Sequence, residues 1–268
     1  MPTTREELMS DYDRNVSARW GTAARTRTAE IDQGLRAYML GVYNYMTLGL
    51  GLTGVVAFGA NMLATTSDPS QAVSRIGNIY LTSTGLALYG SPLRWVIMLA
   101  PLAFVLFFSF RIDRMSASSA RNLFLAFAAA MGLSLSTILL VYTGTSVARA
   151  FFITAAAFGG LSFYGYTTKR DLSPIGSFLV MGLIGLVIAS LVNLFVQSSA
   201  FQFGLSILSV LIFAGLTAWD TQAIKEMYFA GDGYEVQTKK SVNGALMLYL
   251  DFINIFQSLI YLTGNRNN

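Results

Sequence analysis

The chain has 268 residues, of which 54% are hydrophobic and only 12% are charged, against roughly 25% charged residues in an average soluble domain. With a mean hydropathy of +0.53, it holds more apolar surface than one soluble core of this length can bury, so we predict a polytopic membrane protein. The absence of His and Cys excludes Ser-His-Asp and Cys-His catalysis, zinc sites built from these residues, His-ligated haem and disulfides. The net charge of +4 is explained by membrane topology, so we expect no nucleic-acid partner.

Residues 1–36 are polar, with acidic and basic side chains intermixed and no apolar run typical of a signal peptide. We therefore expect no cleavage, and the acidic residues also argue against a mitochondrial transit peptide. The sequence predicts two parts: a charged cytoplasmic N-terminal tail over residues 1–36 and a membrane domain over residues 37–268.

Seven long apolar segments follow the tail. Each is close to the ~20 residues that a helix needs to cross a hydrocarbon core about 30 Å thick, so the fold class is an all-α integral membrane protein with seven transmembrane helices. The longest connections are about 64–92 and 225–242. The predicted spans are about 37–63, 93–110, 122–142, 148–168, 175–196, 203–224 and 243–262.

Lys and Arg are distributed unequally between the two sides that seven crossings define. The side of the N-terminus takes 14 of the 18 basic residues and the other side takes 4. Because cytoplasmic loops carry an excess of Lys and Arg, we expect a multi-pass protein with its N-terminus in the cytoplasm and its C-terminus outside, in the plasma or inner membrane if the source is bacterial. Six crossings would destroy this agreement in every later loop.

Glycines are concentrated on the first and fourth predicted helices. Small residues let transmembrane helices approach closely, so we expect these positions to lie at helix contacts. They are Gly49, Gly51, Gly54 and Gly59 on the first helix, and Gly159, Gly160 and Gly165 on the fourth.

Asp220 and Asp251 are the two acidic residues, of 14, that lie inside apolar segments. A carboxylate within a transmembrane helix costs roughly 2.5 to 3.5 kcal/mol on insertion scales and usually faces the bundle interior or a water-filled path. In the predicted topology the two lie roughly 7 and 12 Å from the cytoplasmic ends of the sixth and seventh helices, so they can meet if these helices are neighbours. Two carboxyl groups in contact in a low dielectric cannot both ionise cheaply, so we expect a shared proton.

The seventh predicted helix carries one polar stripe. Met247, Asp251, Asn254 and Ser258 follow the spacing i, i+4, i+7, i+11 and therefore share one face. Such a face at the centre of a bundle could line a water or ion path, which makes Met247, Asn254 and Ser258 candidates for pore lining. Interhelical hydrogen bonding alone would explain Asn254 and Ser258 but explains Asp251 poorly.

Arg111 lies at the inner end of the second predicted helix, at about the depth of Asp220. It could pair with that carboxylate. From the residues alone, the alternative is that Arg111 only reaches the headgroups, as part of the positive-inside signal with Arg114 and Arg121.

Three strings resemble the Bax inhibitor-1 family, also called the transmembrane Bax inhibitor motif family. They are ALMLYLDFINIFQS at 245–258, KRDLSPIGSF at 169–178 and WDTQAI at 219–224. The resemblance implies six helices around a central C-terminal seventh and a pH-sensitive calcium leak. It also implies a paired sensor at Asp220 and Asp251, with Arg111 as an ion-pair partner for Asp220. An outer acid and arginine pair has no match here, because the outer end has only Arg266.

We therefore expect a calcium or cation leak channel, not an enzyme, in which the aspartate pair switches protonation. Calcium would be the permeant ion, bound transiently by Asp220 and Asp251 with carbonyls or waters completing its shell. Protons would be the regulator, with no tightly bound cofactor. The lipid bilayer and calcium ions are the expected partners, and the sequence identifies no protein partner.

Three alternatives remain open. A proton-coupled transporter of a small solute would also use a carboxylate pair. An intramembrane aspartyl protease is disfavoured, because Asp251 stands in LYLDFI and Asp220 in TAWDTQ instead of a GxGD string. A purely structural protein predicts that neutralising both aspartates stabilises the fold without loss of any flux.

Overall fold

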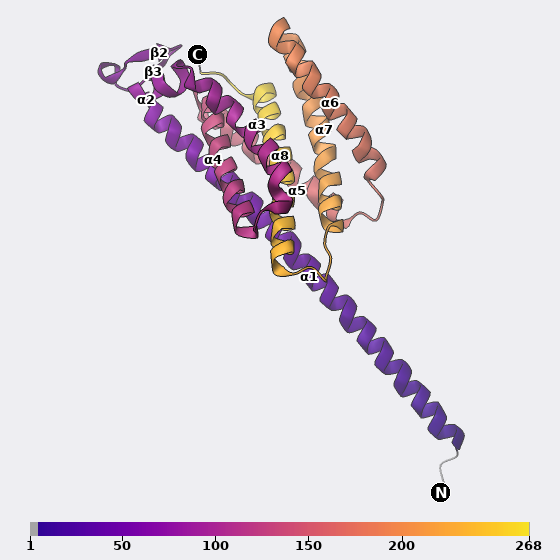
Figure 1. The fold of residues 1–268 in the computed structure, drawn as a ribbon. Coiled ribbons are helices and arrows are strands. Elements are labelled where there is room, and N and C mark those ends of the chain that lie inside the picture. Colours follow the sequence, from indigo (N-terminus) through magenta and orange to yellow (C-terminus); the bar gives the residue numbers. More distant parts are fainter. Residues whose placement is uncertain (1–4, 268) are drawn as a thin grey trace.

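The computed structural model describes the backbone of residues 5–267 and the side chains from residue 33 onward, apart from those of Ser109 and Asp113. Seven long helices form a bundle, with a small sheet at one end (Figure 1). The long helices are α1 (Arg5–Ala64), α3 (Leu93–Arg111), α4 (Ala117–Val141), α5 (Gly144–Thr167), α6 (Ser173–Val196), α7 (Ser199–Glu226) and α8 (Tyr234–Thr263).

The predicted fold class is confirmed. Within the described residues, six helices are long and apolar enough to cross a membrane, counting Gln33–Ala64 of α1, and a seventh span arises if the bent pair Ser83–Gly90 and Leu93–Phe108 is one crossing. This pair comprises α2 (Ser83–Gly85), the π-helical turn η2 (Leu86–Gly90) and α3, and it bends by 60°. The bend has a local cause: Ser91 is extended directly before Pro92, where proline disfavours helical backbone in the preceding residue.

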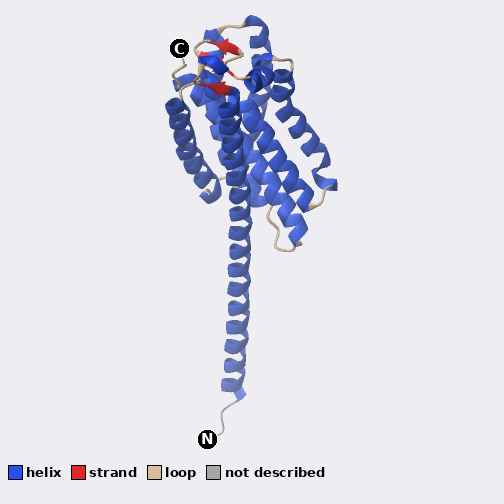
Figure 2. Ribbon diagram, turned by 90° about the vertical axis from the view of Figure 1, so that its left-hand side faces the viewer, coloured by secondary structure: helices blue, strands red, loops and turns tan. Residues whose placement is uncertain are grey.

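The connection between the first two spans contains a three-stranded antiparallel sheet that the sequence analysis did not predict. Its strands are β1 (Thr65–Thr66), β2 (Ser74–Ile76) and β3 (Ile79–Leu81), in the order β1-β3-β2. Gly77, with φ of +57°, makes the turn between β2 and β3. The sheet lies at the same end of the bundle as the C-terminus (Figure 2), and we call this the sheet end. The opposite end, which carries the α3–α4, α5–α6 and α7–α8 connections, is called the basic end.

Helix α8 is the most enclosed element. In the apolar stretch of α8 that could span a membrane, 61% of the residues are buried, against 11% in the corresponding stretch of α6. It packs against α1, α4, α5 and α7, whereas α3 packs on α4, and α6 on α7. An arrangement of all six other helices around α8 is therefore not confirmed. Four helices surround it closely, and α3 and α6 lie further out.

A cluster of aromatic rings joins α8 to α4 and α1. Tyr249 is fully buried and packs edge-on against Phe124 and Phe127, with centroid distances of 5.8 and 5.5 Å. Its hydroxyl lies 2.7 Å from the Thr53 hydroxyl, which in turn donates to the Ala128 carbonyl at 2.9 Å. The one polar atom that this large ring brings into the core is therefore hydrogen-bonded, as burial requires.

The glycine prediction is correct at only two of the seven positions. A Cβ on Gly165 would lie 2.1 Å from the Ala218 carbonyl oxygen, and one on Gly49 would lie 2.7 Å from the Phe124 ring. These two glycines allow close approach of α5 to α7 and of α1 to α4. The other five have nothing within 4 Å of an added Cβ, so they are not at close helix contacts: Gly51, Gly54, Gly59, Gly159 and Gly160.

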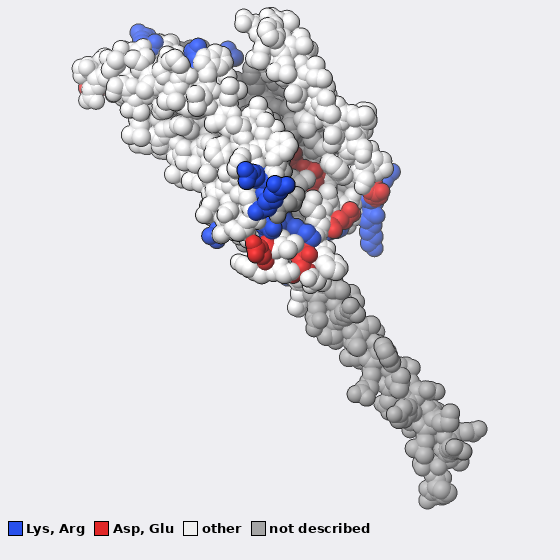
Figure 3. Space-filling model, in the orientation of Figure 1, with Lys and Arg blue, Asp and Glu red and all other residues white. Residues whose placement is uncertain are grey.

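Charged side chains gather at the basic end, with a few Lys and Arg at the sheet end and a broad uncharged band between them (Figure 3). This is the pattern of a membrane-spanning bundle. The predicted boundary between a tail of residues 1–36 and the membrane domain stays a prediction, since the side chains of 1–32 lie outside the described residues. The orientation of the termini also stays a prediction.

Candidate functional site

Asp220 of α7 and Asp251 of α8 come together in the core. Their exposed fractions are 8% and 3%, and their carboxyl groups lie within hydrogen-bonding reach of each other. The Thr217 hydroxyl, one turn before Asp220, is within reach of the Asp251 carboxyl group. Asp251 Oδ2 is nevertheless buried without a hydrogen-bond partner among the described atoms. The sequence prediction that these aspartates meet is therefore matched by the geometry.

Hydroxyl groups of three helices form a buried chain beside the pair. Tyr43 of α1 lies 2.7 Å from the Ser162 hydroxyl of α5, which lies 3.0 Å from the Thr221 hydroxyl of α7. Thr221 donates to the Thr217 carbonyl at 2.7 Å. This chain ends one residue from Asp220, so it fixes the part of α7 that carries the acid against α1 and α5.

Between the aspartate pair and the basic end, the bundle is closed by apolar side chains. Val42 of α1, Ile224 of α7 and Val242 of α8 each have an exposed fraction of 0% and belong to one hydrophobic cluster. Gly244 allows this closure, since an added Cβ there would lie 2.9 Å from the Ile224 side chain. We call Val42, Ile224 and Val242 the apolar seal.

Between the aspartate pair and the sheet end, the bundle is hollow. A cavity of ≈ 600 Å³ lies between α4, α6, α7 and α8, and we call it the main cavity. Asn254 and Ser258 line it, roughly 4.5 and 10.5 Å along α8 from Asp251. Ser258 donates to the Ser209 hydroxyl across the cavity wall at 2.8 Å.

The third predicted pore-lining residue lies elsewhere. Met247 is half-buried and packs against the large hydrophobic cluster on the basic side of Asp251. The polar stripe predicted for the last helix therefore borders the cavity only at Asn254 and Ser258, on the sheet side of Asp251.

The structure does not bring Arg111 to Asp220. Arg111 is exposed at the end of α3, its guanidinium lies 5.7 Å from the centroid of the Phe107 ring, and it forms no ion pair with a described acid. Helix α3 packs on α4 and not on α7, which explains the separation. The predicted ion pair is absent from this state of the protein.

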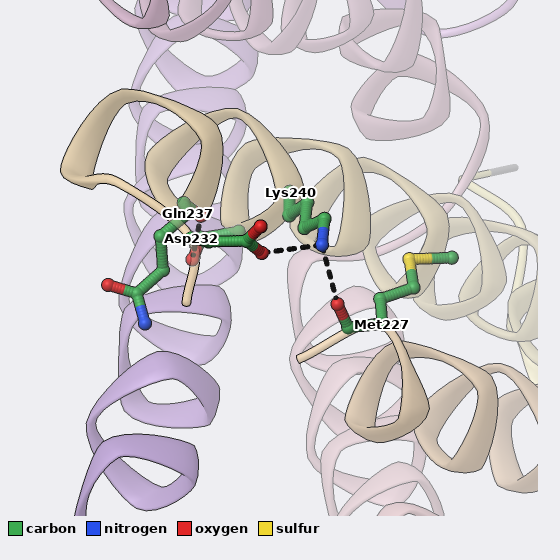
Figure 4. Close-up of polar contacts among 5 residues, drawn as sticks. Met227, Asp232, Gln237 and Lys240 are labelled. Carbon is green, nitrogen blue, oxygen red and sulfur yellow. Dashed lines mark hydrogen bonds and ion pairs between the residues drawn. The ribbon is translucent and has the colours of Figure 1, made fainter. Parts of the chain in front are cut away.

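Two lysines, to which the sequence pattern gave no role in the site, form hydrogen bonds at the basic ends of α7 and α8. The Lys240 ammonium group lies between the Asp232 carboxylate and the Met227 carbonyl, which it contacts at 2.5 and 2.9 Å (Figure 4). Lys225 donates to the Tyr166 carbonyl of α5 at 2.9 Å. The sequence held one indication of the Lys240 contact: Asp232 lies in the short connection between α7 and α8, eight residues before Lys240.

The described residues contain no cluster of three or more acidic side chains that could hold a metal ion. The aspartate pair alone supplies too few oxygens for the six to eight that calcium prefers. The pair by itself therefore does not provide a complete calcium shell.

A bundle of membrane-spanning helices with a buried acidic pair, a closed basic side and a hollow opposite side defines a class of polytopic membrane proteins with a polar interior. The family profile described as "Inhibitor of apoptosis-promoting Bax1" matches residues 35–268. The chain belongs to the Bax inhibitor-1 family.

Relatives from several bacteria match over almost their whole length. The chain is 46% identical to RP147 of Rickettsia prowazekii over 97% of its own length and all of that protein. It is 43% identical to the inner membrane protein YbhL of Escherichia coli K12, over 87% of this chain and 93% of YbhL. A Caulobacter vibrioides protein is 41% identical over 96% of the chain and all of the relative. These comparisons support a multi-pass inner membrane protein.

Proposed function

We propose that the protein is a pH-sensitive leak channel for calcium, gated by protonation of the Asp220 and Asp251 pair. The observation that carries the proposal is the contact of two buried carboxyl groups, one with an unpartnered oxygen, at a level of α7 and α8 between the residues that line the main cavity and those of the apolar seal. At this level a change of charge can open or close a path.

The pair supplies a two-state switch. With one shared proton, the carboxyl groups attract each other and α7 and α8 stay in contact. Loss of that proton places two negative charges together in a low dielectric, which is relieved if a cation enters or the helices separate. The direction follows: we expect calcium flux to rise as the pair loses its proton with increasing pH.

Calcium would arrive through the main cavity. Side chains with oxygen atoms line its α7 and α8 walls, including Ser206, Ser209, Asn254 and Ser258. They can replace part of the ion's water shell, and the two carboxylates with the Thr217 hydroxyl can do so further along. Passage to the basic end requires the apolar seal to part. In that second state Arg111 would reach Asp220 and neutralise it.

The test is calcium flux into dye-loaded liposomes that hold the purified protein, from pH 5 to pH 8. We expect a pH-dependent flux in the wild type, with the pH dependence lost in Asp220→Asn and in Asp251→Asn. Glu235→Gln is the matched control, because Glu235 is exposed in the first turn of α8 and lies outside the pair. No calcium flux at any pH from folded, inserted protein would refute the leak channel.

One observation favours a second candidate, a proton-coupled transporter. The main cavity, at ≈ 600 Å³, is within the range of small-molecule sites and exceeds the needs of a single ion. Uptake of a small solute that saturates and requires a pH gradient would support the transporter, whereas a transporter would not give calcium flux that rises in proportion to concentration.

A further inference from the structure

Two cavities lie side by side near the sheet end. Beside the main cavity, a second cavity of ≈ 420 Å³ lies between η2, α3, α4 and α6. Ser134, Thr137 and Leu194 line both cavities, so the two adjoin each other. We call the two cavities together the lateral crevice.

The crevice faces the bilayer. Helices α4 and α6, which form its two sides, are not among the closely packed helix pairs, whereas α6 packs closely on α7. Figure 3 shows a groove between α6 and the part of the bundle formed by α3 and α4. Both helices are membrane-spanning, so the medium that meets this groove is lipid.

The walls of the crevice differ in chemistry. Helix α6 contributes apolar side chains, of which Leu183, Val187, Leu191 and Leu194 are examples, while the polar groups of the main cavity come mainly from α7 and α8. An acyl chain can therefore lie along α6 without displacing water from the polar wall. This arrangement suits a molecule with one long apolar part.

Arg94 is the one charged residue among the described residues that line the crevice. It lies in the first turn of α3 with its guanidinium 5.2 Å from the centroid of the exposed Trp95 ring. It forms no ion pair with a described acid. Trp and Arg together are typical of the headgroup level of a membrane, and a guanidinium binds phosphate through two parallel hydrogen bonds.

We propose that the lateral crevice binds an anionic phospholipid, with its phosphate at Arg94 and one acyl chain along α6. The Ser134 hydroxyl, on the α4 wall that both cavities share, can donate to a glycerol ester oxygen, whereas the Thr137 hydroxyl donates to the Ser134 carbonyl at 2.9 Å. A net negative lipid is preferred over a zwitterionic one, since the positive charge of Arg94 is not balanced within the described part of the chain.

The headgroup half of the proposal is tested by native mass spectrometry of the full-length protein in mild detergent. Phosphatidylglycerol or phosphatidylcholine with identical acyl chains is titrated in. We expect one phosphatidylglycerol to be retained preferentially, and its retention to fall about tenfold in Arg94→Gln. Arg75→Gln is the control, because Arg75 lies on β2 at the same end but outside the crevice. Equal retention of the two lipids, or equal retention by wild type and Arg94→Gln, overturns the proposal.

The acyl-chain half is tested with Leu194→Trp. Leu194 lines both cavities and is 67% exposed, so a larger ring can occupy the crevice without disturbing the core. We expect loss of retained phosphatidylglycerol, whereas Ile188→Trp, at an exposed position of α6 outside the crevice, keeps it. Full retention in Leu194→Trp would place the chain elsewhere and refute the site. Neither result depends on calcium flux, so the lipid site can be refuted or supported independently of the proposed function.

Discussion

Near the basic end α7 and α8 meet without a gap, whereas toward the sheet end the same two helices border a cavity of ≈ 600 Å³. In the first region Gly244 brings the α8 backbone against Ile224. In the second, one hydrogen bond from Ser258 to Ser209 joins the helices. The aspartate pair lies where one kind of packing gives way to the other. Tight packing of α7 and α8 near the basic end thus stabilises the fold, whereas the cavity between them and their neighbours toward the sheet end serves the proposed function.

The largest effect is expected from Ile224→Ala, which removes part of the apolar seal. Replacing a buried Ile by Ala costs about 2–5 kcal/mol because it also leaves a cavity. The measurement is the free energy of unfolding in detergent micelles. Ile207→Ala is the control, since Ile207 lies on the same helix but is 43% exposed. Equal losses in the two variants would contradict the difference drawn between the two regions.

A second variant tests the close approach of α5 to α7. The Cβ of Gly165→Ala would meet the backbone oxygen of Ala218 at 2.1 Å, which cannot move without separating the helices. We expect a loss of about 1–3 kcal/mol, the range for overpacking. Gly160→Ala, on the same helix with nothing within 4 Å, should change the unfolding free energy by less than about 0.5 kcal/mol. Chemical denaturation followed by circular dichroism compares the two, and a harmless Gly165→Ala would disprove the tight contact.

On the hollow side, Ser258→Ala should have a small effect. It removes the 2.8 Å hydrogen bond to Ser209, and interhelical hydrogen bonds in membranes contribute about 0.6 kcal/mol on average. Because the cavity can hold water, Ser209 is not left unsatisfied. Thermal unfolding should therefore shift by much less than in Ile224→Ala. A loss comparable to that of the seal variant would show that this region is packed as tightly as the other.

The smallest effect concerns pH and the start of α6. The backbone amide and hydroxyl of Ser173 hydrogen-bond to Asp171 and lower the pKa of its carboxyl group. Ionised Asp171 therefore stabilises the fold at pH values above the pKa of the unfolded chain, about 3.9. This stabilisation is lost as the pH falls through the lower pKa of the folded protein. Exchange of the Ser173 amide should be faster in Asp171→Ala than in wild type at pH 6, and the difference should vanish in strong acid. A difference that persists there would assign the protection to another contact.

The spans were predictable because a membrane imposes length and hydropathy on each crossing. Predicted segments such as 175–196 agree with Ser173–Val196 of α6 to within two residues. Helix α8 was predicted to begin near residue 243 but begins at Tyr234, since its first turns are polar and lie outside the apolar pattern. The sheet between β1 and β3 was missed because strands of two or three residues show no periodicity.

The aspartate pair was predictable because an acid in an apolar helix is costly and two such acids on consecutive helices can meet. The separation of Arg111 from Asp220 was not predictable, since depth along the membrane normal says nothing of which helices are neighbours. Helix α3 packs on α4, away from α7. The chain from Tyr43 to Thr221 was also beyond prediction, because single hydroxyls on apolar helices are common and their partners depend on helix rotation.

The C-terminal segment fixes one end of α8 to its neighbours. The Asn265 carbonyl accepts from the Thr143 amide at 3.0 Å, the Asn265 amide donates to the Ser146 hydroxyl at 3.0 Å, and the Asn267 amide donates to the Val141 carbonyl at 2.9 Å. A motion of α8 that keeps these bonds is a tilt about its sheet end, because sliding along its axis would break them. The pivot of such a tilt lies near Thr263, about 18 Å along the helix from Asp251. Because displacement grows with distance from the pivot, each degree of tilt moves the basic end of α8 further than it moves Asp251.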